Sequence, residues 1–478
     1  MYKQTICRLL EDRLDDGPVR KGTVAMKKLL SFTAILVFLG PTLWGGLAAQ
    51  RDTERRSVEG LLHDLRHPDA PRRIEAARLL GEHKIVAGVP GLITAAKDPD
   101  PEVRYAVAVA LRRINDPRAL PAFVELTRDP ETRIRKVAVD GIVNLYVGED
   151  SGFLTGLKKV VNFLNPLSDD YDPRAVEPFV PVSEDAVNAL IDLLFQDDSG
   201  LRRDAAQALG ILRARKALRA IEDALGRETS DDVKVELIRA VYKIGDPEGG
   251  EAVVPFIRDP DKRVHDEAIL TAGRLRVKAA VSILNDLYRV GVEERRKIFG
   301  FVPVSGADDL QRKVLEALAY IADPSSKDIF EDALDDSRDH YRRFGAEGLG
   351  RLGDSSYVEL IATKYLREES KSVKLAMSYA LFRLGRKEHL VELVDNLGSD
   401  QVYYYLLELP PAEVALLFPY LQTEDDSTVI RLLDVIGLRG DAKAVDVVKE
   451  LTAHSNPDVA SATNLALRRL YARFPEGR

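Results

Sequence analysis

A column of basic residues recurs along the sequence at nearly constant spacing. Its members are Arg73, Arg104, Arg135, Arg202, Lys234, Arg342 and Lys374. Such a ladder of cations could bind a polyanion. Acidic residues lie six positions before several of them, as Asp98 does before Arg104, and His265 and Gln311 interrupt the column. We therefore predict that the column mainly forms an aspartate–arginine lattice between neighbouring segments, with polyanion binding as the alternative.

No other set of residues gathers the groups of a catalytic site. The sequence has no glycine-rich phosphate loop, no G-x-S-x-G and no H-E-x-x-H. His63 and His67 have a spacing that could hold a metal on a helix, but a lone pair at a helix end is more typical of solvated side chains. The only cysteine is Cys7, so a zinc–thiolate site is not expected. We expect no enzymatic activity, no metal and no cofactor.

The basic column belongs to a repeated pattern. The pattern is an acidic residue, often a proline, and then V-R-x-x-A-x-x-A-L-G, as in "DPDPEVRYAVAVALRRIND" and "DDSGLRRDAAQALGILR". The position of its first valine advances mostly by 31 or 32 residues, as from Val233 to Val264. Two stretches of helical periodicity fall in each period, and the second is rich in alanine. The sequence therefore predicts two helices per repeat, with small residues that let helices approach closely.

The acidic turn between the two helices predicts helix caps. A carboxylate there can accept from the free N–H groups of the first turn, and proline suits the first helical position. We expect the caps at Asp98, Asp129, Asp259 and Asp336, with Pro99, Pro130 and Pro260 next in the helix.

One helix pair cannot bury its apolar face alone, so the pairs must stack. Over about residues 55–475 the pattern resembles HEAT repeats, especially the short kind named after phycocyanobilin lyases. The resemblance implies an all-α fold, an α-solenoid of about 12 HEAT-like helix pairs that form a curved superhelix. It further implies that the second helices make the concave face, where a partner binds by default. A lyase-like enzyme related to bilin lyases is the alternative function.

The repeat register divides the chain. We expect a charged N-terminal extension at 1–25, a signal peptide at 26–49, repeats at 55–145, 183–290 and 308–475, and insertions at 146–182 and 291–307, with a degenerate repeat near 390–420.

The N-terminal segment is typical of a secretory signal. Lys27 and Lys28 precede an apolar run at 29–39, and small residues follow before a charged stretch. We expect an exported protein, periplasmic or secreted, that touches a membrane only through this signal. An uncleaved inner-membrane anchor is the alternative, because residues 29–50 carry no charge.

The insertions and one aromatic cluster are candidate contact surfaces. Tyr403, Tyr404 and Tyr405 are consecutive, so at about 100° per residue at least one should be exposed. The net charge of −8 does not favour nucleic acid. We predict a non-enzymatic scaffold of the bacterial cell envelope that binds a protein or peptide, although the insertions could instead pack on their own rim. The candidate contact residues are Lys158, Lys159, Phe163, Arg295, Arg296, Phe299, Phe301, Tyr403, Tyr404 and Tyr405.

Overall fold

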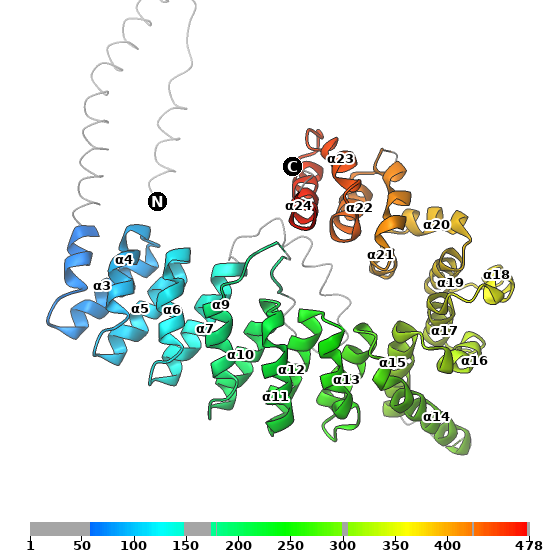
Figure 1. The fold of residues 1–478 in the computed structure, drawn as a ribbon, viewed down its shortest axis with the longest axis horizontal. Helices are drawn as coiled ribbons and strands as arrows, with labels where there is room; N and C mark the ends of the chain where they lie inside the picture. Colours follow the sequence, from blue (N-terminus) through cyan, green and yellow to red (C-terminus); the bar gives the residue numbers. More distant parts are fainter. Residues whose placement is uncertain (1–57, 148–173, 178, 299–304, 423–424, 476–478) are drawn as a thin grey trace, which may run out of the picture.

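The computed structural model describes residues 58–147, 174–177, 179–298, 305–422 and 425–475, with the backbone alone for 292–298 and 305–307. Every regular element in these ranges is a helix, and the helices form twelve successive pairs. The pairs stack side by side into a curved array, which we call the arch (Figure 1). The predicted all-α solenoid of about twelve pairs is confirmed.

The first helix of most pairs is short, and α14 (Val281–Ile298) is the long exception. The first pair begins with a helical stretch at 58–64. The later first helices are α4 (Val89–Ala95), α6 (Leu120–Leu126), α9 (Glu184–Leu193), α11 (Leu218–Arg227), the 3-10 helix η4 (Glu248–Arg258), α14 (Val281–Ile298), α16 (Lys327–Leu334), α18 (Val358–Tyr365), α20 (Leu390–Asp395), the 3-10 helix η9 (Pro411–Gln422) and α23 (Ala444–Lys449).

The second helices are mostly longer. They are α3 (Ala70–Glu82), α5 (Pro101–Ile114), α7 (Thr132–Val147), α10 (Ser199–Ile211), α12 (Asp231–Ile244), α13 (Lys262–Arg274), α15 (Ser305–Ile321), α17 (Asp339–Leu352), α19 (Lys371–Arg383), α21 (Asp400–Leu407), α22 (Asp426–Arg439) and α24 (Pro457–Arg473). Three-residue 3-10 turns lead into many first helices: η1 (Val86–Gly88), η2 (Pro117–Ala119), η3 (Arg215–Ala217), η5 (Lys278–Ala280), η6 (Pro324–Ser326), η7 (Ser355–Tyr357) and η8 (Lys387–His389).

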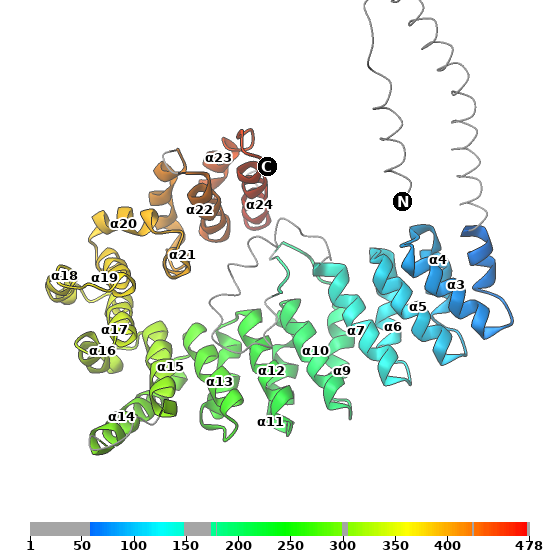
Figure 2. The ribbon, with the colours of Figure 1, turned by 180° about the vertical axis from the view of Figure 1, so that it is seen from behind.

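The second helices line the inner side of the arch. In its C-terminal half α15, α17, α19 and α21 lie inside α14, α16, α18 and α20 (Figure 1). Seen from behind, the last repeat with α24 again curves back toward the repeats around α9 to α12 (Figure 2). The predicted concave layer of second helices is therefore present in the C-terminal half of the arch.

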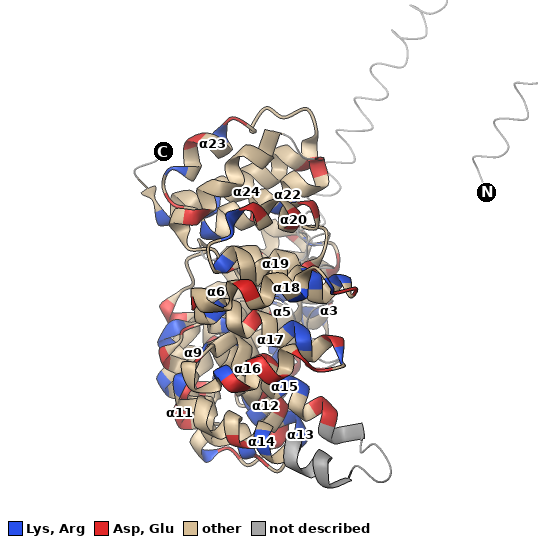
Figure 3. Ribbon diagram, turned by 90° about the vertical axis from the view of Figure 1, so that its right-hand side faces the viewer, with Lys and Arg blue, Asp and Glu red and all other residues tan. Residues whose placement is uncertain are grey.

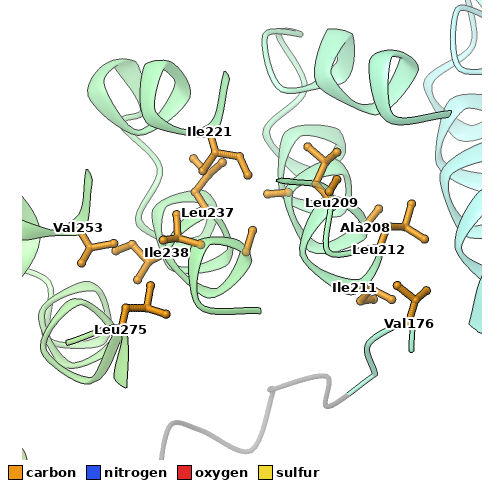
Figure 4. Close-up of a cluster of buried hydrophobic side chains, with 14 of the residues drawn as sticks. Val176, Ala208, Leu209, Ile211, Leu212, Ile221, Leu237, Ile238, Val253 and Leu275 are labelled. Atoms are coloured by element: carbon orange, nitrogen blue, oxygen red, sulfur yellow. The ribbon is translucent and has the colours of Figure 1, made fainter. Parts of the chain in front are cut away.

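One apolar core runs through the whole arch. Buried hydrophobic side chains form a single cluster from Leu65 in the first repeat to Leu470 in the last. In the middle, Leu209 of α10 and Ile238 of α12 are completely buried, and Figure 4 shows them among neighbouring aliphatic side chains. Each repeat thus completes the core of the next, which is the condition that stacking was expected to meet.

Glycines in the second helices allow neighbouring repeats to approach closely. A Cβ placed on Gly273 of α13 would lie 2.5 Å from the Cα of Ala317 in α15, closer than a real side chain can come. The same glycine–alanine contact recurs down the array, at Gly81–Ala110, Gly210–Ala240, Gly350–Ala380 and Gly437–Ala466. The glycine of the repeated A-L-G motif therefore sets how tightly the second helices stack.

The predicted helix caps are wrong by two residues. The N-cap of α5 is Asp100, with Pro101 first in the helix, and the N-cap of α13 is Asp261, whose carboxylate accepts from two backbone N–H groups. The predicted caps instead hold the turn before the helix, because each accepts from the backbone N–H two residues ahead. These contacts are Asp98–Asp100, Asp129–Glu131, Asp259–Asp261 and Asp336–Arg338, so Pro99, Pro130 and Pro260 lie in the turn.

The predicted insertion at 291–307 is largely helical, because α14 continues to Ile298 and α15 begins at Ser305. Of the insertion predicted at 146–182, the structure describes both ends but not residues 148–173. The interval near 390–420 holds the short pair α20 and α21, followed by η9. The predicted extension and signal peptide lie outside the described residues.

Replacing Gly273 with alanine should push α13 away from α15 and lower the free energy of unfolding by about 1–3 kcal/mol. The matched control is Gly226→Ala in α11, where an added Cβ meets nothing within 4 Å. This control should leave stability unchanged or raise it by up to about 1 kcal/mol, because alanine is the better helix former. Thermal unfolding followed by circular dichroism checks both, and equal melting temperatures would contradict the close-contact argument.

Candidate protein-binding site on the inner face

The predicted basic column is present, and most of its members are paired. The Arg104 guanidinium bonds both carboxylate oxygens of Asp129 in the next repeat, at 2.6 Å from Nε to Oδ2 and 3.1 Å from Nη2 to Oδ1. Its Nη1 donates to the carbonyls of Asp98 and Pro99 in the turn before its own helix. Equivalent pairs lie 25 or 26 residues apart, at Arg73–Asp98, Arg202–Glu228, Lys234–Asp259 and Arg342–Glu368.

The predicted lattice is therefore confirmed, with one refinement. The acid six positions earlier offers its backbone carbonyl, while the carboxylate comes from the following repeat. The side chains of Arg104 and Asp129 are only 14% and 4% exposed, so these charges are already neutralised. Arg135, which ends the first unbroken run of the column, bonds Thr132 and two carbonyls instead. The polyanion alternative thereby loses five of the seven charges on which it depended, because each of these five has a carboxylate partner.

The expectation that at least one of the three consecutive tyrosines is exposed is wrong. Tyr405 is buried, and Tyr403 and Tyr404 are half-buried. The hydroxyl of Tyr405 donates to Glu347 at 2.5 Å, and that of Tyr403 donates to Asp434. The arch is curved enough that α21 packs against helices of other repeats, which covers faces that an isolated helix would expose.

Half-buried aromatic rings gather around one arginine on the inner face. The Arg274 guanidinium carbon lies 4.1 Å from the ring centre of Tyr320 and 5.7 Å from that of Tyr404. These residues come from α13, α15 and α21, and Tyr242 of α12 lies within electrostatic range of both Arg274 and Tyr404. We call Tyr242, Arg274, Tyr320 and Tyr404 the inner-face patch. Rigid aromatics with an arginine are the residue types that anchor protein interfaces.

Burial raises the pKa of Tyr320 and of Tyr404 further above neutrality. It raises the pKa of Tyr404 to about 12, with a smaller contribution from Tyr242. The Arg274 side chain is still 21% exposed and forms an ion pair with Glu316 at 3.2 Å. At neutral pH the patch therefore presents a neutral aromatic surface around one partly accessible cation, which suits a partner with apolar and carbonyl groups.

A buried charged network holds the patch in place. Arg351, only 2% exposed, bonds both oxygens of Glu408 at 2.8 and 2.9 Å and lies over the ring of Tyr320. Glu408 also accepts from Tyr379 at 2.9 Å and pairs with Arg276 at 2.7 Å. Arg276 follows α13 and Glu408 follows α21, so this ion pair joins two parts of the inner side that are 132 residues apart in the sequence.

Most residues of this site were not predicted from the sequence, although the sequence contains a signal for some of them. A second basic column stands ten positions after the first valine of the repeated pattern and marks the last turns of the second helices. Its members are Arg113, Lys243, Arg274, Arg351, Arg383 and Arg469. Three of them, Arg274, Arg351 and Arg469, hold the inner face together. Periodicity could have found the column, but not the acids and rings that it meets.

Most of the other predicted contact residues have side chains that the structure does not describe. Lys158, Lys159, Phe163, Phe299 and Phe301 lie outside the described residues, as do the side chains of Arg295 and Arg296. His63 is 83% exposed and His67 accepts from the Asp69 N–H. Among the described side chains no three metal-ligating groups gather. Over the same ranges, no helix combines the length and apolar character needed to cross a membrane.

Glu267 of α13 is a buried carboxyl with a raised pKa. It is 2% exposed, and its Oε1 accepts from Arg239 Nε at 2.7 Å. Its Oε2 has no hydrogen-bond partner among the described residues. Burial outweighs the attraction of Arg239 and raises the pKa of Glu267 to about 7.

Charges of both signs are interspersed elsewhere. Figure 3 shows Lys and Arg alternating with Asp and Glu over α14, α16 and α18, where they do not form a patch of one charge sign. Two small pockets of about 380 and 250 Å³ lie at equivalent rim positions, beside Arg73–Asp98 and Arg342–Glu368. They follow from repeat packing and lie apart from the patch.

Comparison with known proteins agrees with the repeat architecture. The family model described as HEAT repeats matches residues 58–142. None of the curated proteins matches the chain.

Several solved structures are similar. One is an engineered protein, 19% identical, which covers 86% of this chain and 98% of its own at a TM-score of 0.42. Another is YibA of Escherichia coli, 15% identical, covering 60% and 91% with a TM-score of 0.36. A third is the complex of CpcE and CpcF of phycocyanin lyase from Nostoc, 18% identical, covering 68% and 94% with a TM-score of 0.24. Likenesses at this level carry no activity or partner over to this chain.

A double-mutant cycle on Arg104 and Asp129, each replaced by alanine, should give a coupling energy of about 1–3 kcal/mol, because the pair is largely buried. The matched control is the exposed pair Lys97 and Glu125, which are 3.0 Å apart and 67% and 55% exposed. Its coupling should stay below about 0.5 kcal/mol. Urea unfolding of both cycles provides the measurement, and similar couplings would show that the lattice does not stabilise the stack.

Glu267 should make the protein less stable as pH rises from about 4.5 to 7. The folded protein holds the proton more tightly than the unfolded chain, so raising the pH through this window removes up to about 3 kcal/mol of stability. Glu267→Gln should flatten this part of the pH profile. The control Glu236→Gln, which removes the other carboxylate on Arg239, should keep it. Urea midpoints at several pH values test this, and an unchanged profile in Glu267→Gln would refute the assignment.

Proposed function

We propose that this chain, a HEAT-repeat protein, is a non-enzymatic scaffold that binds a protein partner on the inner face of its arch. The observation that carries the proposal is the inner-face patch: three half-buried tyrosine rings around the partly exposed Arg274. Such side chains lose little conformational entropy on binding, because their neighbours already hold them. A partner segment that covers the rings would gain apolar burial and cation–π contact.

The shape of the site favours a folded or extended protein segment over a small molecule. The patch is built from α12, α13, α15 and α21, so its four residues come from four repeats. The second helices that carry it are stacked through the continuous core. A partner that bridges several repeats would also sense the curvature of the arch, since bending the stack changes the distance between α13 and α21.

We further propose that the scaffold acts in the bacterial cell envelope. The support is the N-terminal sequence, in which basic residues precede an apolar run and small residues follow. The partner would then be an envelope protein, and binding would not need a cofactor.

Site-specific photocrosslinking tests the binding face. A benzoylphenylalanine at position 404 should give a defined crosslinked product in cells of the source organism. The control position is Leu366, at the end of the outer helix α18 and 80% exposed. It should not give the same product.

Two outcomes would contradict the proposal: the same product from both positions, or no product from position 404 under conditions where the labelled protein is folded. Crosslinking should also persist at raised salt, because apolar and cation–π contacts are weakly screened. A polyanion complex would instead weaken steeply.

A further inference from the structure

A short extended segment of the chain is bound by the last repeat. Residues 174–177, just before α9, have no regular secondary structure. The Glu177 carboxylate there accepts two parallel hydrogen bonds from Arg469 of α24, each 2.8 Å long. The two residues are 292 positions apart in the sequence. This two-point contact is the geometry with which arginine selects a carboxylate.

Arg469 is held ready for this contact by its own neighbours. Its Nη1 donates to Asp434 of α22 at 2.5 Å, and Tyr403 of α21 donates to the other oxygen of Asp434. The Arg469 side chain is 8% exposed and that of Asp434 is 9% exposed. Because three helices fix the guanidinium, an incoming carboxylate meets a preorganised donor.

The residue before the glutamate is recognised as well. Val176 is 5% exposed and lies beside Ile211 at the end of α10 (Figure 4). Its backbone N–H donates to the Ile211 carbonyl at 2.8 Å, so an open carbonyl at a helix end is satisfied. The segment thus uses an aliphatic side chain, one backbone bond and one carboxylate, which are the contacts of a bound linear peptide.

Two further arginines stand next to Arg469 at the ends of neighbouring helices. Arg439 ends α22, and Arg473 ends α24 and donates to the Gly437 carbonyl at 2.7 Å. Partial desolvation and the positive charges of Arg439 and Arg469 lower the pKa of Arg473, although the residue as a whole remains exposed. Both side chains are exposed, and within the described parts of the chain neither has a carboxylate partner. We call Arg439, Arg469 and Arg473 the arginine clamp.

We propose that the arginine clamp binds an extended acidic segment of a partner protein, with an aliphatic residue next to its first carboxylate, in competition with Glu177 of the chain itself. This inference rests on the proposed scaffold function and names the chemistry of one partner contact. The partner's first carboxylate takes the place of Glu177 on Arg469, and further carboxylates pair with Arg439 and Arg473.

Charge favours an acidic protein segment over nucleic acid. The whole chain carries a net charge of −8, which would repel a polymer as highly charged as nucleic acid outside the clamp. A short segment needs only three cations and a small apolar contact. Glu177 next to Val176 shows that an aliphatic–acidic pair fits.

A labelled peptide tests the clamp on the full-length protein. The probe is Gly-Ala-Val-Glu-Glu-Glu-Gly, and the control peptide has glutamine at each glutamate. By fluorescence anisotropy, Glu177→Gln should bind the probe about fivefold tighter than the unmodified protein. Arg439→Gln and Arg473→Gln should each weaken binding about fivefold in that background. Both arginines are exposed, so the melting temperatures of these two variants should not change. The matched control is Arg367→Gln, an exposed arginine that lines the rim pocket beside Arg342 and Glu368.

Several results would overturn the clamp. They are equal binding of both peptides, unchanged binding in the Arg439→Gln Arg473→Gln double variant, and tighter binding of an oligothymidylate than of the probe. This experiment and the crosslinking experiment can fail independently. If the probe does not bind but position 404 still crosslinks, only the clamp proposal is rejected. If the probe binds but position 404 gives no product, only the proposed role of the inner-face patch is rejected.

Discussion

Close stacking of the second helices is the constraint on which the rest of the structure depends. Because Gly273 meets Ala317 backbone to backbone, and the same contact recurs in other repeats, neighbouring second helices lie closer than larger side chains would allow. The first helices have no equivalent series of contacts and stay farther apart. A stack that is tighter on one side than on the other must curve toward the tight side, so the glycines make the second helices the inner face of the arch.

The guanidinium–carboxylate lattice fixes each repeat to the next at the helix turns. Arg104 joins the turn before its own helix to the acid of the following repeat. These contacts therefore set the rotation of one repeat relative to the next as well as the distance between them. The lattice is interrupted at Arg135, after which the first insertion follows, and again at His265 and Gln311 around the α14–α15 pair. Curvature at these interruptions depends on the core and on long-range contacts such as Arg276–Glu408.

The inner face thus has two kinds of surface. In the middle repeats and at α21, tyrosines and Arg274 form a nearly neutral patch that a protein segment can cover. Near the last repeat, arginines predominate, and one of them already holds a carboxylate of the chain. An ordinary solenoid could have left both regions far apart. Here the arch returns on itself, which places them on the same inner side.

The sequence by itself determined the repeat, the two helices per repeat, the solenoid and the Arg–Asp lattice, because all of these follow from local periodicity and from contacts between adjacent repeats. It also determined which residues are basic at the ends of the second helices. Only the tertiary structure decided that Tyr405 is buried, that Arg276 meets Glu408 and that Arg469 meets Glu177. Those contacts depend on the curvature summed over many repeats, in which small rotations at each junction add up. No local pattern in the sequence encodes that sum.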